Sequence, residues 1–230
     1  MKTFTNIILL HGAIGASDQL EPLAKELSEN GFKTYSLNFS GHGQASFQNQ
    51  FGIVQFAYEL KSFIGKNNLV KPDIFGYSMG GYVALYLASQ HPNLMGKIIT
   101  LGTKFEWSPE IAAIEIKMLD AKTILEKVPK FAEVLQRRHG NNWKLLLQKT
   151  AEMMVELGTN NLLNKNSFSN IINKVMIGLA EGDNMVSVTE TNYAASMING
   201  AKRFTLHNSK HPIESINTGR LTEIILKFPE

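Results

Sequence analysis

The sequence contains no cysteine among its 230 residues, which excludes a disulfide framework, a thiol nucleophile and a thiolate metal site. It also lacks a strong excess of charge. The 23 basic residues nearly balance the 20 acidic ones, giving a net charge of +3. The chain therefore lacks the strong positive electrostatic potential that attracts nucleic acid or an anionic membrane surface, and we expect neither as a partner.

Long hydrophobic runs are missing as well. No apolar stretch approaches the roughly 18 residues needed to span a bilayer, so we expect no membrane span. The start, MKTFTNIILLHG, passes from a short apolar run straight into glycine-rich sequence, without the apolar region and cleavage site of a secretory signal. We therefore expect a cytoplasmic protein, and the length suits one globular domain.

Short apolar runs alternate along the chain with longer amphipathic ones. This alternation is typical of parallel strands joined by helices. Several of the short runs are almost continuously apolar, as expected where helices cover both faces of a sheet. The sequence therefore predicts an α/β fold with a mostly parallel sheet of about six strands, at residues 6–10, 33–39, 72–77, 97–102, 174–180 and 202–207.

Residues 104–172 break this alternation. They show helical periodicity with interleaved charges and no convincing strand. Pro129 falls between two apolar stripes, where a proline ends one helix and suits the first turn of the next. We predict a helical insertion after the fourth strand, between core segments 1–103 and 173–230.

The stretch GYSMG, at residues 76–80, matches the G-x-S-x-G pattern, with a predicted buried strand before it and an amphipathic helix after it. Gly76, Gly80 and Gly81 allow the strand and the helix to approach closely. The helix N-terminus offers free backbone N–H groups beside the hydroxyl. We predict that Ser78 is a nucleophile. The alternative is a glycine-lined turn with a serine that caps the helix.

A serine nucleophile needs a base, usually a histidine oriented by a carboxylate. His211 falls in the loop beyond the last predicted strand, where α/β sheets place their chemistry. We predict that His211 is the base. The other five histidines have structural interpretations in turns, at a helix end or at the end of a strand: His11, His42, His91, His139 and His207.

Asp183 is the predicted carboxylate, because it lies in the loop after the fifth predicted strand. The alternative is an aspartate that only stabilises a turn. Glu181 is a nearby rival and Glu106 a more distant one. The chain order Ser78, Asp183, His211 is the order expected of one particular fold with this turn motif, and it favours Asp183.

Together with HGAIG, LNFSGHG and GDNMV, these residues resemble the α/β-hydrolase superfamily over most of the chain. The resemblance implies that the backbone N–H groups of Ala13 and Met79 form an oxyanion hole, and that segment 104–172 is a cap over the substrate pocket. Aromatic and methionine side chains from this segment are candidates to line the pocket, although most such residues at helical spacing belong to a core. The candidates are Phe105, Trp107, Met118, Met153 and Met154.

The sequence departs from the family pattern in three places. Little chain precedes NIILLHG, which leaves no room for the usual N-terminal hairpin and suits a sheet of about six strands. Ser40 stands where an arginine often precedes Gly-His-Gly. Lys210 stands where a glycine often precedes the histidine, and a lysine there could disturb the pKa of His211 or the shape of the site.

The sequence thus favours a serine hydrolase that cleaves an ester-like carbonyl substrate through Ser78, His211 and Asp183, with an acyl-enzyme intermediate. No cofactor or metal is expected, and the partner is a small molecule with a hydrophobic acyl or ester group. One alternative is a triad-bearing C–C hydrolase, lyase or menaquinone-pathway-type synthase. Another is a non-catalytic binding protein with the hydrolase fold. The sequence leaves the natural substrate and the oligomeric state open.

Overall fold

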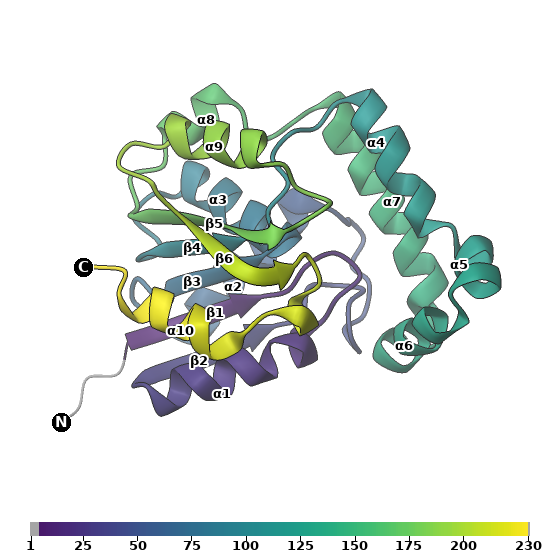
Figure 1. Ribbon diagram of the computed structural model, residues 1–230, viewed down its shortest axis with the longest axis horizontal. Coiled ribbons are helices and arrows are strands. Elements are labelled where there is room, and N and C mark those ends of the chain that lie inside the picture. Colours follow the sequence, from purple (N-terminus) through teal and green to yellow (C-terminus); the bar gives the residue numbers. More distant parts are fainter. Residues whose placement is uncertain (1–4, 230) are drawn as a thin grey trace.

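The computed structural model describes residues 5–229 and contains one six-stranded sheet with the strand order β2-β1-β3-β4-β5-β6 (Figure 1). The first four residues of the start MKTFTNIILLHG lie outside the described residues. Every pair of neighbouring strands is parallel. This confirms the predicted α/β fold. The strands are β1 (Thr5–Leu10), β2 (Phe32–Leu37), β3 (Asp73–Tyr77), β4 (Ile98–Leu101), β5 (Val175–Gly182) and β6 (Lys202–Lys210).

Helices cover both faces of the sheet. One face packs against α2 (Ile53–Lys66), α3 (Met79–Gln90), α8 (Lys165–Ser169) and α9 (Val188–Met197). The other packs against α1 (Glu21–Glu29) and α10 (Thr218–Leu226). Successive side chains of a strand point to opposite faces, so Ile8 and Leu10 join the first core, and Ile7 and Leu9 join the second. Burial on both faces explains why the strands are continuously apolar.

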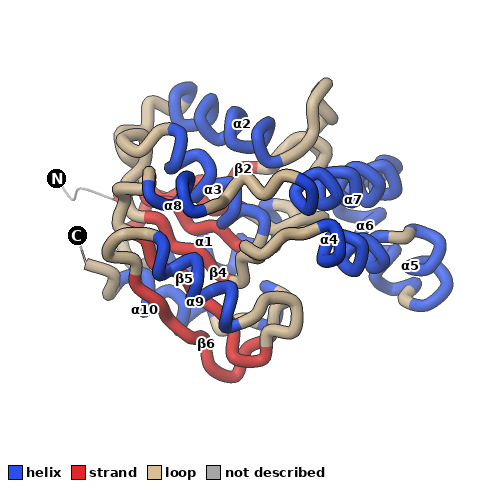
Figure 2. The backbone as a smooth tube through the Cα atoms, turned by 90° about the horizontal axis from the view of Figure 1, so that it is seen from above, coloured by secondary structure: helices blue, strands red, loops and turns tan. Residues whose placement is uncertain are grey.

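The helices between residues 109 and 159 extend beyond the carboxyl ends of the strands, as Figure 1 and Figure 2 show. Residues Ile124, Ala132, Leu135, Trp143 and Leu147 form a buried apolar cluster among them. By contrast, α8 packs against α3 and α9. The extending elements are α4 (Pro109–Glu115), η2 (Ile116–Leu119), α5 (Ala121–Lys127), α6 (Pro129–His139), η3 (Gly140–Asn142) and α7 (Trp143–Thr159). We call them the α4–α7 segment.

The carboxyl ends of the strands position the candidate site. Ser78 directly follows β3, Asp183 follows β5 and His211 follows β6. Because parallel strands end at the same edge, the topology brings these three residues to one rim of the sheet. The remaining short elements, η1 (Ser17–Leu20) and η4 (Ile213–Ser215), also lie beyond strand ends. Within residues 5–229, no helix has both the length and the apolar character that crossing a bilayer requires.

Candidate active site

Ser78 lies in a strained turn between β3 and α3. Its φ of 50° is in the left-handed region that residues other than glycine rarely adopt. The turn depends on close packing, since a Cβ at Gly76 would lie 2.5 Å from the Cα of Gly81. Although Ser78 occupies the N-cap position of α3, its side chain makes no capping hydrogen bond within the described chain. The hydroxyl is therefore not used to cap the helix.

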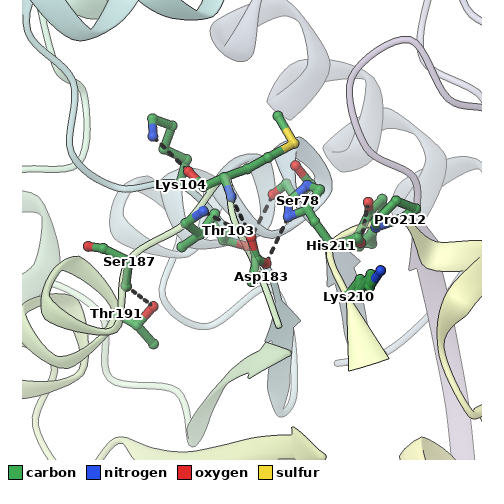
Figure 3. A network of polar contacts seen from close by, with 12 residues as sticks. Ser78, Thr103, Lys104, Asp183, Ser187, Thr191, Lys210, His211 and Pro212 are labelled. Carbon is green, nitrogen blue, oxygen red and sulfur yellow. Dashed lines mark hydrogen bonds and ion pairs between the residues drawn. The ribbon is translucent and has the colours of Figure 1, made fainter. Parts of the chain in front are cut away.

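The imidazole of His211 is hydrogen-bonded to the carboxylate of Asp183 (Figure 3). Nδ1 and Oδ2 are 2.8 Å apart, and the two side chains are only 8% and 1% exposed. The other carboxylate oxygen, Oδ1, accepts the backbone N–H groups of Met185 and Val186, each at 2.9 Å. With Nδ1–H donated to Asp183, the Nε2 of His211 is left to accept a proton.

The pKa of Asp183 lies below its ordinary value. Burial by itself raises the pKa, but the hydrogen bond and charge of His211 and the amides of Met185 and Val186 outweigh it. The carboxylate is therefore ionised at neutral pH. It fixes the orientation and the tautomer of the His211 ring.

Three residues that sequence reasoning missed contact the site residues at the strand ends. The hydroxyl of Tyr77 donates to the carbonyl of His211 at 2.8 Å, and Thr103 Oγ1 donates to the carbonyl of Ser78 at 3.1 Å. Gly102, with φ of 62°, lies against the His211 ring, where a Cβ would come within 3.2 Å of Cε1. Each of them lies at the carboxyl end of β3 or β4, and this position is the sequence feature from which a role at the site could have been predicted.

The rival acids and histidines lie elsewhere. Glu181 accepts hydrogen bonds from the exposed His207 ring and from the backbone of Asn208. The side chain of Glu106 is exposed. His91 lies beside Lys61, with 3.1 Å between Nε2 and Nζ. Of the acids in residues 5–229, Asp183 is the one hydrogen-bonded to His211.

Three other histidines form a buried cluster behind the glycine-rich loop after β1. The His42 ring lies 4.8 Å from that of His11 and 6.2 Å from that of His139. Burial lowers the pKa of all three, for His11 to about 4. His11 Nδ1 donates to the carbonyl of Gly12 at 2.8 Å, so this histidine supports the turn, as the sequence predicts.

Ser78 and His211 line the same cavity, which has a volume of about 580 Å³. Four of the five pocket candidates also line it: Trp107, Met118, Met153 and Met154. Phe105 does not. It is buried against Phe168, with ring centroids 6.0 Å apart. The backbone N–H of Phe105 donates to the carboxylate of Glu190. This hydrogen bond holds that part of the loop against the core.

Several lining residues were not predicted from the sequence. Leu119, Phe131 and Val134 add apolar surface from the α4–α7 segment. A polar part of the wall is the ion pair between Lys104 Nζ and Glu115 Oε1, 3.1 Å apart and mostly buried. The cavity is therefore mainly apolar, with a charged pair on its wall.

Ala13 and Met79 line the cavity beside Ser78. Met79 is the first residue of α3, where backbone N–H groups have no partner inside the helix. Neither amide donates a hydrogen bond within residues 5–229. Two such free donors, one in the turn after β1 and one at the N-terminus of α3, are suited to holding a developing negative charge. In the part of the chain that the structure describes, no three His, Cys, Asp or Glu side chains are grouped to hold a metal.

The family follows from a sequence comparison. Residues 5–213 match the family described as the alpha/beta hydrolase fold, so the chain belongs to this family. Among curated proteins, it is 24% identical over 169 residues to a "Probable alcohol acetyltransferase" of Wickerhamomyces anomalus, covering 73% of this chain. The match covers 47% of that relative, so the chain spans about half its length.

Solved structures share the fold over nearly the whole chain. An esterase from Exiguobacterium antarcticum superposes with a TM-score of 0.81 and 17% identity, covering 99% of this chain and 92% of the other. The 2-hydroxy-6-oxo-6-phenylhexa-2,4-dienoate hydrolase of Rhodococcus sp. strain RHA1 superposes with a TM-score of 0.78 and 18% identity, covering 98% and 90%.

Proposed function

We propose that the protein is a serine hydrolase that cleaves esters with a hydrophobic acyl or alcohol group. The observation that carries the proposal is the buried His211–Asp183 hydrogen bond at the cavity that Ser78 also lines. The strained turn at Ser78 and the family of the chain give further support. The mainly apolar wall of the cavity favours a hydrophobic small molecule as substrate.

In the proposed mechanism, Nε2 of His211 accepts the proton of Ser78 as the serine oxygen bonds to the carbonyl carbon. Asp183 stabilises the imidazolium, and the amides of Ala13 and Met79 hold the oxyanion. His211 then gives its proton to the leaving alkoxide as the C–O bond breaks. Water, deprotonated by His211, then attacks the acyl-enzyme, and His211 returns the proton to the serine oxygen as the acyl C–O bond breaks, which releases the acid and the free serine.

Fluorophosphonate labelling tests this proposal. We expect the wild-type chain to be labelled and to hydrolyse p-nitrophenyl esters, and we expect Ser78→Ala to lose both properties. Ser196→Ala, which removes the hydroxyl of a serine on α9, is the matched control and should keep both. A folded wild-type chain without labelling would instead favour a non-catalytic binding protein. Labelling without turnover of any ester would favour C–C cleavage or lyase chemistry at the same serine.

A second candidate function is acyl transfer to an alcohol in place of water. The apolar cavity wall supports it, because such a wall favours an alcohol over water beside the acyl-enzyme. The name of the curated relative, an alcohol acetyltransferase, is consistent with this chemistry. Ester hydrolysis in the presence of ethanol distinguishes the two functions, since transfer gives the ethyl ester as the main product and hydrolysis gives the free acid.

A further inference from the structure

The turn that carries Ala13 has an unusual backbone. Gly15 N donates to the carbonyl of Gly12 at 3.1 Å, which closes a tight turn over Ala13 and Ile14. Ile14 has a φ of 51°. A β-branched residue rarely adopts this conformation, so its surroundings must hold it there.

His139, the last residue of α6, makes two hydrogen bonds to the loops beside the site. Its Nε2 donates to the carbonyl of Ile14 at 2.8 Å, and its Nδ1 accepts the backbone N–H of Gly43 at 2.9 Å. The residue is only 4% exposed. A neutral imidazole has one donor and one acceptor nitrogen, which is what these two contacts require.

Ile14 is also bound to the α4–α7 segment through its side chain. It packs against the buried cluster formed by Ile124, Ala132, Leu135, Trp143 and Leu147. The carbonyl and the side chain of Ile14 are thus both held by helices that lie more than a hundred residues further along the chain. The turn beside Ser78 therefore depends on these helices for its shape.

We propose that His139 is a positioning residue, which holds the Gly12–Gly15 turn so that the Ala13 amide points to the oxyanion formed at Ser78. This inference rests on the proposed function. Without the Nε2 contact, Ile14 can relax to a favoured φ and displace the amide. A misplaced oxyanion donor weakens transition-state stabilisation while leaving substrate binding largely intact.

Three substitutions of His139 separate its two contacts. His139→Gln places an amide N–H near the position of Nε2 and keeps the donor to Ile14. His139→Asn places an oxygen near the position of Nδ1 and keeps only the acceptor for Gly43. His139→Ala removes both. The control is Asp18→Asn, which weakens the ion pair of Asp18 with Arg138 at the same end of α6.

The measurement is kcat and KM for p-nitrophenyl butyrate with the full chain, normalised to the sites labelled by fluorophosphonate. We expect the Ala and Asn variants to lose roughly tenfold to a hundredfold in kcat with little change in KM. The Gln variant and Asp18→Asn should stay within about threefold of wild type, a difference below 1 kcal/mol.

Wild-type kcat in the Ala and Asn variants would overturn the proposal, as would equal losses in the Gln and Asn variants. A loss in Asp18→Asn as large as in His139→Ala would assign the effect to general docking of α6 and overturn it too. If His139→Ala does not fold, the comparison of Gln with Asn decides. A wild-type chain that is neither labelled nor active would overturn the proposed function, and this inference with it.

Discussion

The imidazole of His211 is held on two sides, with its ring bonded to Asp183 and its backbone carbonyl bonded to Tyr77. The ring therefore has little freedom to turn away from the cavity. Such restraint matters for a proton acceptor, because proton transfer requires the nitrogen to stay within hydrogen-bond reach of the hydroxyl. In the proposed mechanism, that hydroxyl belongs to Ser78.

Replacing the proposed base should abolish most of the activity. We expect His211→Gln to lower kcat/KM for a p-nitrophenyl ester by at least about a thousandfold, because an amide cannot accept the serine proton. The matched control is His207→Gln, on the exposed ring paired with Glu181, which should keep wild-type activity. Retained activity in the first variant, or an equal loss in the second, would contradict the assignment of the base.

The buried histidine cluster should make the fold sensitive to mild acid. His11, His42 and His139 all have pKa values lowered by burial, and that of His11 falls from 6.5 to about 4. Below pH 6.5 these histidines bind protons in the unfolded chain but stay neutral in the folded chain. The free energy of unfolding therefore decreases as pH falls. A single group contributes at most about 1.4 kcal/mol per pH unit, between its unfolded and folded pKa values, and for His11 this range ends near pH 4.

Urea unfolding between pH 7.5 and 4.5 measures this slope. Asp183 does not contribute there, because its lowered pKa matters only as pH falls below its ordinary value of 3.8. We expect His42→Phe, which removes one titrating group from an aromatic environment, to reduce the slope relative to wild type. A pH-independent free energy of unfolding in the wild-type chain would disprove this account.

At the scale of secondary-structure elements, one carboxylate fixes the loop that leaves β4. The Oε2 of Glu190 accepts the amides of Phe105 and Glu106, both at 3.0 Å, and its Oε1 accepts the amide of Ser187 at 2.7 Å. Glu190 is buried on α9. It therefore joins the first turn of α9 to the segment that leads into the α4–α7 helices.

Glu190→Gln should destabilise the fold. A glutamine offers one acceptor oxygen, so its NH2 group must face at least one backbone N–H, and the buried donors lose their partner. We expect a loss of about 1–3 kcal/mol in the free energy of unfolding, measured with urea. Glu223→Gln, on the exposed face of α10, is the control and should change it by less than about 0.5 kcal/mol. Similar effects of the two substitutions would contradict the role of Glu190.

An element could be predicted from the sequence where its own residue pattern indicates which of its faces are buried. The apolar runs of β1, β3 and β4 required cover on both faces, and the glycines around Ser78 required a close strand-to-helix turn. The end of β6 was harder to predict. The strand continues to Lys210 through polar residues, past a register shift in its pairing with β5 and past Asn208, which has a φ of 55°.

Contacts between distant segments were not predictable in the same way. The sequence indicates that His139 ends a helix, and it does end α6, but nothing in its neighbourhood indicates a bond to Ile14. Phe105 and Trp107 have the same aromatic character, and only the direction of the loop separates the core residue from the lining residue. Tyr77 reaches His211 because two strands end at one rim, which no local pattern records.

On the scale of the whole molecule, the cavity forms where the carboxyl edge of the sheet meets the α4–α7 segment. Ala13, Ser78 and His211 come from the sheet side, and Met118 and Met154 come from the helices. We propose that this segment acts as the cap that determines which acyl chains fit. The volume available to the acyl chain should then depend on side chains of α7, far from Ser78 in the sequence.

Met154→Trp tests this division of roles, because a larger side chain on the cavity wall leaves less room for a long acyl chain. We expect kcat/KM for p-nitrophenyl octanoate to fall at least about tenfold relative to that for the acetate, since each excluded methylene is worth about 1 kcal/mol or more. Val155→Trp is the matched control. Val155 is the next residue of α7, does not line the cavity and is 47% exposed, so this variant should keep the wild-type ratio.

The two tryptophan variants also separate a cap that selects the substrate from helices that only stabilise the fold. If the α4–α7 segment only stabilises the fold, both variants lower the activity toward the two esters by the same factor, and the ratio stays constant. If it selects the acyl chain, the ratio changes in Met154→Trp alone, and the acetate reaction continues because Ser78 and His211 keep their environment. An unchanged ratio in Met154→Trp would therefore remove the α4–α7 segment from the account of specificity, while the proposed chemistry at the edge of the sheet would stand.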